Sequence, residues 1–360
     1  MPFIKTMLFA ALIAQGAASS AGAADLVSLP RKAQAGPGRD ESYAGVTVLY
    51  DAIRDGAGNR LRVIATHPDR PEGRYPAIFV VGWLSCDTVE ARAGSSDATQ
   101  LMLQSMAKLP GFATVRLEKA GVGDSEGNCA TSDFNAELAD YQQAFRHLSS
   151  YAFVDSNAIF LFGISNGGGF APLVANGAPI KGYVTDGGWV KTWYEHMLEI
   201  ERRRLSLAGH GPNEINNLMK SVEALYSAYL LERKSPQEIF AVRPQLKVLW
   251  EGDSAQQYGR PPAYYQQLQA LDLMAAWSEV RVPVLALHGE YDWIMSGSDI
   301  QLIAELVNRN APGAAQFLEL ARTGHTFEHF DSQRAAFAGK AGPFEQSIAK
   351  TVGDWFTRHR

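Results

Sequence analysis

The 360-residue chain has only two cysteines, Cys86 and Cys129, and they do not form a C-x-x-C pair. It also has no H-E-x-x-H pattern or comparable ligand spacing, so we expect neither a metal site nor a cofactor. Basic residues form no stripe along the sequence. The single cluster, residues 202–204, follows Glu199 and Glu201 and is typical of a solvated helix face. With a formal net charge of −5, the composition does not favour a nucleic-acid partner.

Long apolar runs are also missing. Beyond the N-terminus, no stretch approaches the roughly 18 apolar residues that a transmembrane helix needs, so we expect no membrane span. The apolar run at residues 7–14 follows Lys5 and precedes an A-x-A cleavage pattern at 21–23. These features predict a signal peptide over residues 1–23 and a flexible leader over 24–44, with a retained amphipathic N-terminus as the alternative. We therefore expect an exported protein, periplasmic or secreted, in which two cysteines tend to pair, although two free buried thiols are the alternative.

Short β-rich runs alternate with helical patterns along most of the chain. Apolar residues recur at spacings of three and four over residues 134–148 and 344–356, which predicts helices there. The alternation predicts a mostly parallel sheet with helices on both faces, while a turn at 55–59 predicts an antiparallel hairpin at the start. The predicted strands cover residues 46–53, 60–67, 77–81, 112–117, 158–163, 182–185, 282–287 and 315–320.

One segment, residues 189–280, interrupts this alternation. It is rich in aromatic residues and has almost no strand pattern. Residues 235–238 (S-P-Q-E) predict a helix start with a capping box and a proline in the first turn. We therefore predict a helical insertion between two core strands, the core being residues 45–188 and 281–360.

The motif G-I-S-N-G at residues 163–167 carries the strongest functional signal. It directly follows a continuous apolar run and precedes a helical segment, which is the setting of a nucleophile elbow. Ser165 would then lie in a tight turn that requires small neighbours. The N-terminus of the following helix would direct N–H groups towards an oxyanion beside the serine. A plain glycine-rich turn is the alternative.

A serine nucleophile needs a base, and a histidine base needs a carboxylate to orient it. His325 follows the last predicted strand and is our candidate base, with His329 as its rival. Asp292 follows the preceding strand and is our candidate acid. The chain order of serine, aspartate and histidine is the order expected when the serine lies in a nucleophile elbow of this kind.

Two other carboxylates remain open as the acid. Glu290 lies in the same loop as Asp292, and Asp186 ends the strand after the elbow.

Five sequence stretches together resemble the α/β-hydrolase superfamily, and most closely its bacterial esterase and serine-aminopeptidase-like branch. They are AIFVVGWLSC at 77–86, RLEKAGVGDSEG at 116–127, the elbow, HGEYD at 288–292 and TGHTF at 323–327. The resemblance covers roughly residues 45–360. It implies an eight-stranded, mostly parallel sheet with helices on both faces and a helical cap inserted after strand six, at residues 189–280.

The resemblance also implies an oxyanion hole made of backbone N–H groups. The family usually has His-Gly at the end of strand three, whereas Val81 and Gly82 stand here. The match assigns one N–H to Trp83 and the other to Asn166. The missing histidine leaves Leu84 open as the donor in place of Trp83.

Further features follow from the same resemblance. The third and fourth strands of the family are neighbours, so a Cys86–Cys129 disulfide would pin the oxyanion loop. The cap would place Trp189 and Trp193, together with Leu84, around the substrate pocket, although packing of the cap is the alternative role for its aromatic residues.

These observations predict a serine hydrolase that cleaves carboxylic esters through an acyl-enzyme on Ser165. An aminopeptidase or amidase with the same three residues is the alternative, for which Glu195, Glu199 or Glu201 would hold a substrate ammonium group. A non-catalytic binding protein on this fold is a more distant alternative. The expected partner is a small-molecule ester or amide, and no sequence feature fixes an oligomeric state.

Overall fold

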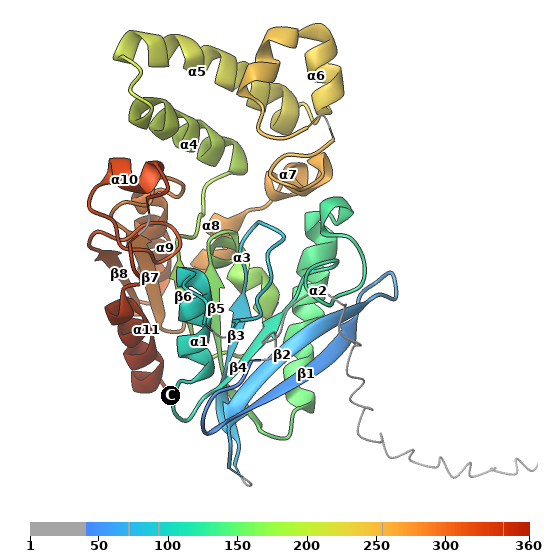
Figure 1. The fold of residues 1–360 in the computed structure, drawn as a ribbon, viewed down its shortest axis with the longest axis vertical. Coiled ribbons are helices and arrows are strands. Elements are labelled where there is room, and N and C mark those ends of the chain that lie inside the picture. The colour runs from blue at the N-terminus through green and yellow to red at the C-terminus, as the bar shows by residue number, and fades with distance from the viewer. Residues whose placement is uncertain (1–40, 71–72, 93, 254, 341) are drawn as a thin grey trace, which may run out of the picture.

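The computed structural model describes residues 41–70, 73–92, 94–253, 255–340 and 342–360 (Figure 1). The predicted signal peptide and nearly all of the predicted leader lie outside these residues. Within the described residues, one sheet of eight strands has the order β1-β2-β4-β3-β5-β6-β7-β8. Its strands are β1 (Val46–Arg54), β2 (Arg60–Pro68), β3 (Tyr75–Val81), β4 (Ala113–Leu117), β5 (Val154–Ile164), β6 (Gly182–Asp186), β7 (Val284–Gly289) and β8 (Ala315–Leu320).

The sheet is mostly parallel, as predicted. β1 pairs with β2, and β2 with β4, in antiparallel register, whereas every pairing from β4 through β3, β5, β6 and β7 to β8 is parallel. Because parallel strands end at the same edge, the loops after β3, β5, β7 and β8 meet at that edge. Three of these loops carry the residues predicted to act together.

Helices cover both faces of the sheet because successive residues of a strand point to opposite sides. In β3, Phe79 packs into one apolar cluster with residues of α2 and α3, and Val80 packs into a second cluster with residues of α1 and α11. Figure 1 shows α1 and α11 on the near face of the sheet. The helices of the core are α1 (Ala98–Ala107), α2 (Phe134–His147), α3 (Asn166–Ala175), α9 (Gly297–Asn310), α10 (Gln333–Phe337) and α11 (Gln346–Arg358).

Among the described residues, five α-helices lie between β6 and β7, and Figure 1 shows four of them, α4 to α7, above the sheet. The side chain of Ser235 accepts from the Glu238 N–H, and the Glu238 carboxylate accepts from the Ser235 N–H, so the predicted capping box is present. A π-helical turn, Ser227–Leu231, extends α5. The inserted helices are α4 (Trp193–Leu207), α5 (Pro212–Tyr226), α6 (Pro236–Val242), α7 (Pro262–Leu268) and α8 (Leu273–Ser278).

The predicted strand ends differ from the observed ends by a few residues. β5 begins at Val154 rather than at residue 158, because the strand includes the polar, partly exposed residues 155–157, which precede the apolar run on which the prediction rests. β7 begins at Val284 rather than at residue 282, because Pro283 has no N–H to donate to a neighbouring strand. Across the described ranges, no helix is both long and apolar enough to cross a bilayer.

Candidate active site

Ser165 lies in a strained turn between β5 and α3. Its backbone has φ 56° and ψ −125°, which a non-glycine residue adopts only where the surroundings enforce it. The turn is tightly enclosed: a Cβ at Gly167 would lie 2.3 Å from the carbonyl oxygens of Val81 and Gly82, and one at Gly163 would lie 2.6 Å from Gly168 Cα. The sequence therefore places glycine where the elbow has no room for a side chain.

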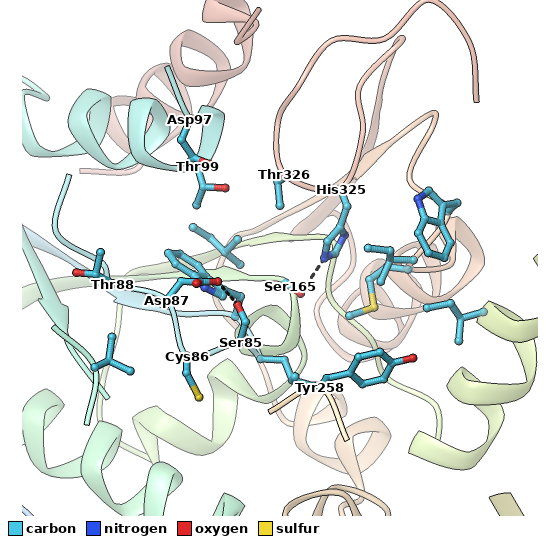
Figure 2. A pocket seen from close by; sticks show the side chains of 18 of the residues that line it. Ser85, Cys86, Asp87, Thr88, Asp97, Thr99, Ser165, Tyr258, His325 and Thr326 are labelled. Atoms are coloured by element: carbon cyan, nitrogen blue, oxygen red, sulfur yellow. Dashed lines mark hydrogen bonds between the residues drawn. The ribbon is translucent and has the colours of Figure 1, made fainter. Parts of the chain in front are cut away.

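His325 reaches Ser165 from the loop after β8. Its Nε2 lies 2.8 Å from Ser165 Oγ, and its Nδ1 lies 2.7 Å from Asp292 Oδ2 (Figure 2 shows the first of these bonds). In the neutral imidazole, the Nδ1–H donates to the carboxylate, which leaves Nε2 free to accept the serine proton. The rival histidine, His329, is not among the residues that line the cavity at Ser165.

Asp292 is held as a carboxylate by the loop after β7. Its second oxygen accepts from the N–H groups of Ile294 and Met295 at 2.8 and 2.9 Å. Burial would raise the pKa of Asp292, but the charge and the hydrogen bond of His325 hold that pKa below its usual value. Burial would lower the pKa of His325, yet the neighbouring Asp292 carboxylate raises it above the ordinary imidazole value.

The two alternative acids make other contacts. The Glu290 carboxylate accepts from the Arg322 N–H at 2.7 Å and makes no hydrogen bond to His325. The backbone oxygen of Asp186 accepts from the Ser165 N–H at 2.7 Å. The Asp186 side chain is buried close to both His325 and Asp292, and burial raises its pKa well above the usual value. Of these three carboxylates, Asp292 is therefore the one that holds the imidazole by a hydrogen bond.

The two predicted oxyanion donors have no protein partner. Within the described part of the chain, neither the Trp83 N–H nor the Asn166 N–H donates to a protein acceptor; Trp83 lines the cavity at Ser165, and Asn166 directly follows the serine and is fully buried. Asn166 is the first residue of α3, where backbone N–H groups have no partner within the helix.

A cavity of about 880 Å³ opens over Ser165 and His325. One face of α4 lines it with residues spaced by three and four: Trp193, His196, Met197, Ile200, Glu201 and Arg204. The opposite side is more polar, and Figure 2 shows Thr88 and Asp87 to the left of Ser165, with Asp97 and Thr99 above them.

Two of the three predicted pocket residues line this cavity, and the third does not. Leu84 and Trp193 contribute to the wall. Trp189 is fully buried away from the cavity, and its Nε1 donates to Asn166 Oδ1 at 2.8 Å, so the prediction that it contacts substrate needs correction. Trp189 therefore lies close to the elbow, but its ring is packed in the interior and does not line the cavity.

The predicted disulfide between Cys86 and Cys129 is present. Cys86 lies in the loop after β3 and Cys129 follows β4, and the two strands are parallel neighbours. The bridge therefore ties the loop that carries Trp83 and Leu84 to the adjacent strand connection.

The glutamates considered for an ammonium site have three different environments. Glu195 forms the capping box at the start of α4 with Thr192. Glu199 pairs with Lys191 at 2.6 Å. Glu201 is buried in the cavity wall, where its carboxylate accepts two hydrogen bonds from the Arg204 guanidinium at 2.7 and 2.9 Å.

Sequence reasoning missed several cavity residues, of which His196 is the one that can titrate close to neutral pH when exposed. It is 2% exposed, its Nδ1 has no hydrogen-bond partner among the described residues, and its ring packs 4.6 Å from that of Trp193. Burial lowers the pKa of His196 to about 3, with the Arg203 charge adding to this effect, so the imidazole is neutral. The helical spacing from Trp193 was the available signal. Among the described residues, no group of three or more His, Cys, Asp and Glu side chains could hold a metal ion.

Solved structures with the same fold include three with substantial coverage. A hypothetical protein from Pseudomonas aeruginosa has 15% identity and a TM-score of 0.56, covering 92% of this chain and 99% of its own. Est1E from Butyrivibrio proteoclasticus, with ferulic acid bound, has 14% identity and a TM-score of 0.55, covering 86% and 98%. Carboxyl esterase 2 from Tuber melanosporum has 12% identity and a TM-score of 0.53, covering 88% and 89%. No curated protein matches the sequence.

The sheet order, the elbow and the Ser165–His325–Asp292 hydrogen bonds define an α/β-hydrolase of the serine type. The sequence profile of the X-Pro dipeptidyl-peptidase (S15) family matches residues 55–326, about three quarters of the chain, and the chain belongs to that family.

Proposed function

We propose that this serine hydrolase cleaves carboxylic esters through an acyl-enzyme on Ser165. The observation that carries the proposal is the continuous path from Ser165 Oγ to His325 Nε2, 2.8 Å, and from His325 Nδ1 to Asp292 Oδ2, 2.7 Å. This arrangement can move the serine proton to the imidazole while Asp292 stabilises the resulting imidazolium.

The proposed reaction has two steps that use the same three side chains. Ser165 Oγ attacks the ester carbonyl as His325 takes its proton, and His325 then gives that proton to the leaving alcohol. Water next attacks the acyl carbon as His325 takes its proton; the bond from that carbon to Ser165 Oγ then breaks, His325 gives the proton to Ser165 Oγ, and the acid leaves. The N–H groups of Trp83 and Asn166 would stabilise the oxyanion in both steps.

The cavity wall favours an ester over a peptide with a free N-terminus. A substrate ammonium group would need an unpaired buried carboxylate. Of the carboxylates that line the cavity, Asp87 and Asp97 are exposed, and Glu201 already pairs with Arg204 at 2.7 Å. We infer that none of them is a strong ammonium site.

Peptide cleavage is the second candidate, because the family is described as X-Pro dipeptidyl-peptidase and because Glu201 is buried in the wall. If Arg204 rotates towards solvent, Glu201 can hold a terminal ammonium. A panel of p-nitrophenyl esters beside aminoacyl and X-Pro p-nitroanilides separates the two functions. We expect turnover of the esters, and selective turnover of the anilides would replace the first proposal with the second.

The nucleophile is tested separately from the substrate. A fluorophosphonate probe should label the wild-type protein, and Ser165→Ala should abolish labelling while leaving the urea midpoint of unfolding unchanged. Labelling that survives in Ser165→Ala would rule out Ser165 as the nucleophile and, with it, the acyl-enzyme on this residue.

We further propose that residues 189–280 form a cap over a core made of residues 45–188 and 281–360, and that the protein is exported. The α4 face over Ser165 supports the cap, and the N-terminal sequence together with the Cys86–Cys129 disulfide supports export. N-terminal sequencing of protein recovered from the periplasm or medium should show a mature chain that begins near residue 24.

A further inference from the structure

Two buried basic side chains share one carboxylate beside the loop that follows β3. Glu137 of α2 accepts from Lys119 Nζ at 3.1 Å and also pairs with the Arg260 guanidinium. Each of the three residues is at most 5% exposed. Since one carboxylate balances only one of the cations, the spare positive charge and the spare donors need other partners.

Most of those partners are backbone carbonyls of one loop. We call residues 82–86 the oxyanion loop. Lys119 Nζ donates to the Trp83 carbonyl oxygen and lies 3.4 Å from the oxygens of Leu84 and Ser85. Arg260 Nε donates to the Leu84 oxygen at 2.9 Å. The cluster therefore holds three successive carbonyls of this loop from one side.

The same loop is also fixed at its beginning and at its end. The Gly82 N–H donates to the Tyr141 hydroxyl at 3.0 Å, and the Trp83 carbonyl oxygen accepts from Lys119. The Gly82–Trp83 peptide unit therefore lies between two groups that are fixed by hydrogen bonds. Because a peptide unit is planar, anchoring both of its neighbours limits the direction of the Trp83 N–H. At the other end, Cys86 is bonded to Cys129, whose carbonyl oxygen accepts from the Arg260 guanidinium at 3.2 Å.

We propose that Lys119 and Arg260 are positioning residues that, through their shared Glu137, hold the oxyanion loop in the conformation that presents its N–H to the reacting carbonyl. The inference rests on the proposed acyl-transfer function. It adds a role for the inserted segment, since Arg260 lies between α6 and α7 while every other member of the cluster belongs to the core. The insertion then contributes to transition-state stabilisation as well as to the cavity wall.

The charge of Lys119 gives this arrangement a pH dependence. Burial lowers the pKa of Lys119 to about 8, against the opposing effect of Glu137, and the Arg260 charge lowers it further. The charged groups that face Lys119 are Glu137, Arg260 and, at longer range, Asp87. Above that pH, the neutral amine makes weaker hydrogen bonds to the loop than the ammonium group does.

The test compares Arg260→Lys and Lys119→Met with the matched control Arg116→Lys. Arg116 is another fully buried arginine paired with a carboxylate, Glu41, and it contacts no residue of the oxyanion loop. Using the best ester or anilide substrate, we expect kcat to fall about 10- to 100-fold in both test variants, with KM changed less than about twofold, because the lost interaction acts on the transition state. Binding of a trifluoromethyl ketone, which forms an oxyanion on Ser165, should weaken by the same factor as kcat.

The control should lose a similar amount of thermal stability while keeping its kcat. The proposal would be overturned if Arg260→Lys and Lys119→Met lose stability but retain kcat and ketone binding. Should both test variants fail to fold, the wild-type pH profile decides: a fall in kcat above about pH 8 at constant KM supports the proposal, and a flat profile to pH 9.5 overturns it. Wild-type protein that is inactive on every ester and anilide would instead refute the proposed function.

Discussion

The indole Nε1 of Trp189 donates a 2.8 Å hydrogen bond to Oδ1 of Asn166, the residue directly after the nucleophile. The Asn166 amide donates in turn to the Tyr264 hydroxyl of α7 at 3.0 Å. The inserted segment therefore holds the elbow from behind through two aromatic side chains, both fully buried.

Trp189→Phe should destabilise the protein without changing substrate binding. The substitution leaves Asn166 Oδ1 buried without its donor, which costs about 1–3 kcal/mol. KM should stay the same because Trp189 does not line the cavity. Trp193→Phe is the matched variant: Trp193 Nε1 has no partner among the described residues, and the ring lines the cavity. Trp189→Phe should therefore lower the urea midpoint of unfolding and leave KM unchanged, whereas Trp193→Phe should change KM more than the urea midpoint. A KM change in Trp189→Phe would contradict the assignment of Trp189 to the interior.

The acid limb of the kcat/KM profile should report His325. The imidazole acts as a base only when neutral, and Asp292 raises its pKa above 6.5, so activity should rise with pH through a midpoint above that value. Asp292→Asn removes the charge that raises the pKa and also the acceptor that fixes the tautomer, so kcat should fall about 10⁴-fold. A midpoint in the wild type below pH 6 would argue against His325 as the base.

Asp140→Asn should stabilise the protein at neutral pH and have little effect in acid. Burial, reinforced by the charges of Asp55 and Glu137, raises the pKa of Asp140 to about 7 from 3.8. Between these two values the folded state binds more protons than the unfolded state, so this carboxyl makes stability fall as pH rises. Asparagine does not titrate, so the variant loses this fall of the free energy of unfolding with rising pH. Urea unfolding should show that the variant is more stable than the wild type at pH 8 but not at pH 4. An equal change of stability at both pH values would refute the raised pKa of Asp140.

Loss of the disulfide should cost stability and loosen the oxyanion loop. The bridge joins residues 43 positions apart, and closing such a loop contributes about 4 kcal/mol in the chain-entropy model. The double variant Cys86→Ser/Cys129→Ser should unfold at a lower urea concentration and lose kcat more than KM. Wild-type protein treated with dithiothreitol provides the same comparison without substitution, and unchanged unfolding after full reduction would contradict the prediction.

The parts of the fold and site that carry local signatures could be read from the sequence. The elbow at Ser165 is marked by small residues between an apolar strand and a helix, because its backbone leaves no space for side chains. Asp292 and His325 follow strands, and the parallel sheet brings the ends of those strands together.

The parts of the site that depend on side-chain orientation or on partners distant in the chain could not be predicted from the sequence. The sequence shows that Trp189 follows a core strand and so predicts it in the pocket, but it does not show which way the indole points. Lys119, Glu137 and Arg260 come from three separate segments with no common spacing, and each looks like an ordinary solvated charge until the chain folds.

The α4 wall of the cavity has an evolutionary consequence. All six of its lining residues lie on one helix face, and within the described residues none of them hydrogen-bonds to Ser165, His325 or Asp292. Changes on that face can therefore alter which molecules are accepted while bond cleavage itself is preserved. Relatives should diversify there first, and libraries that randomise this helix face are the direct route to new selectivity.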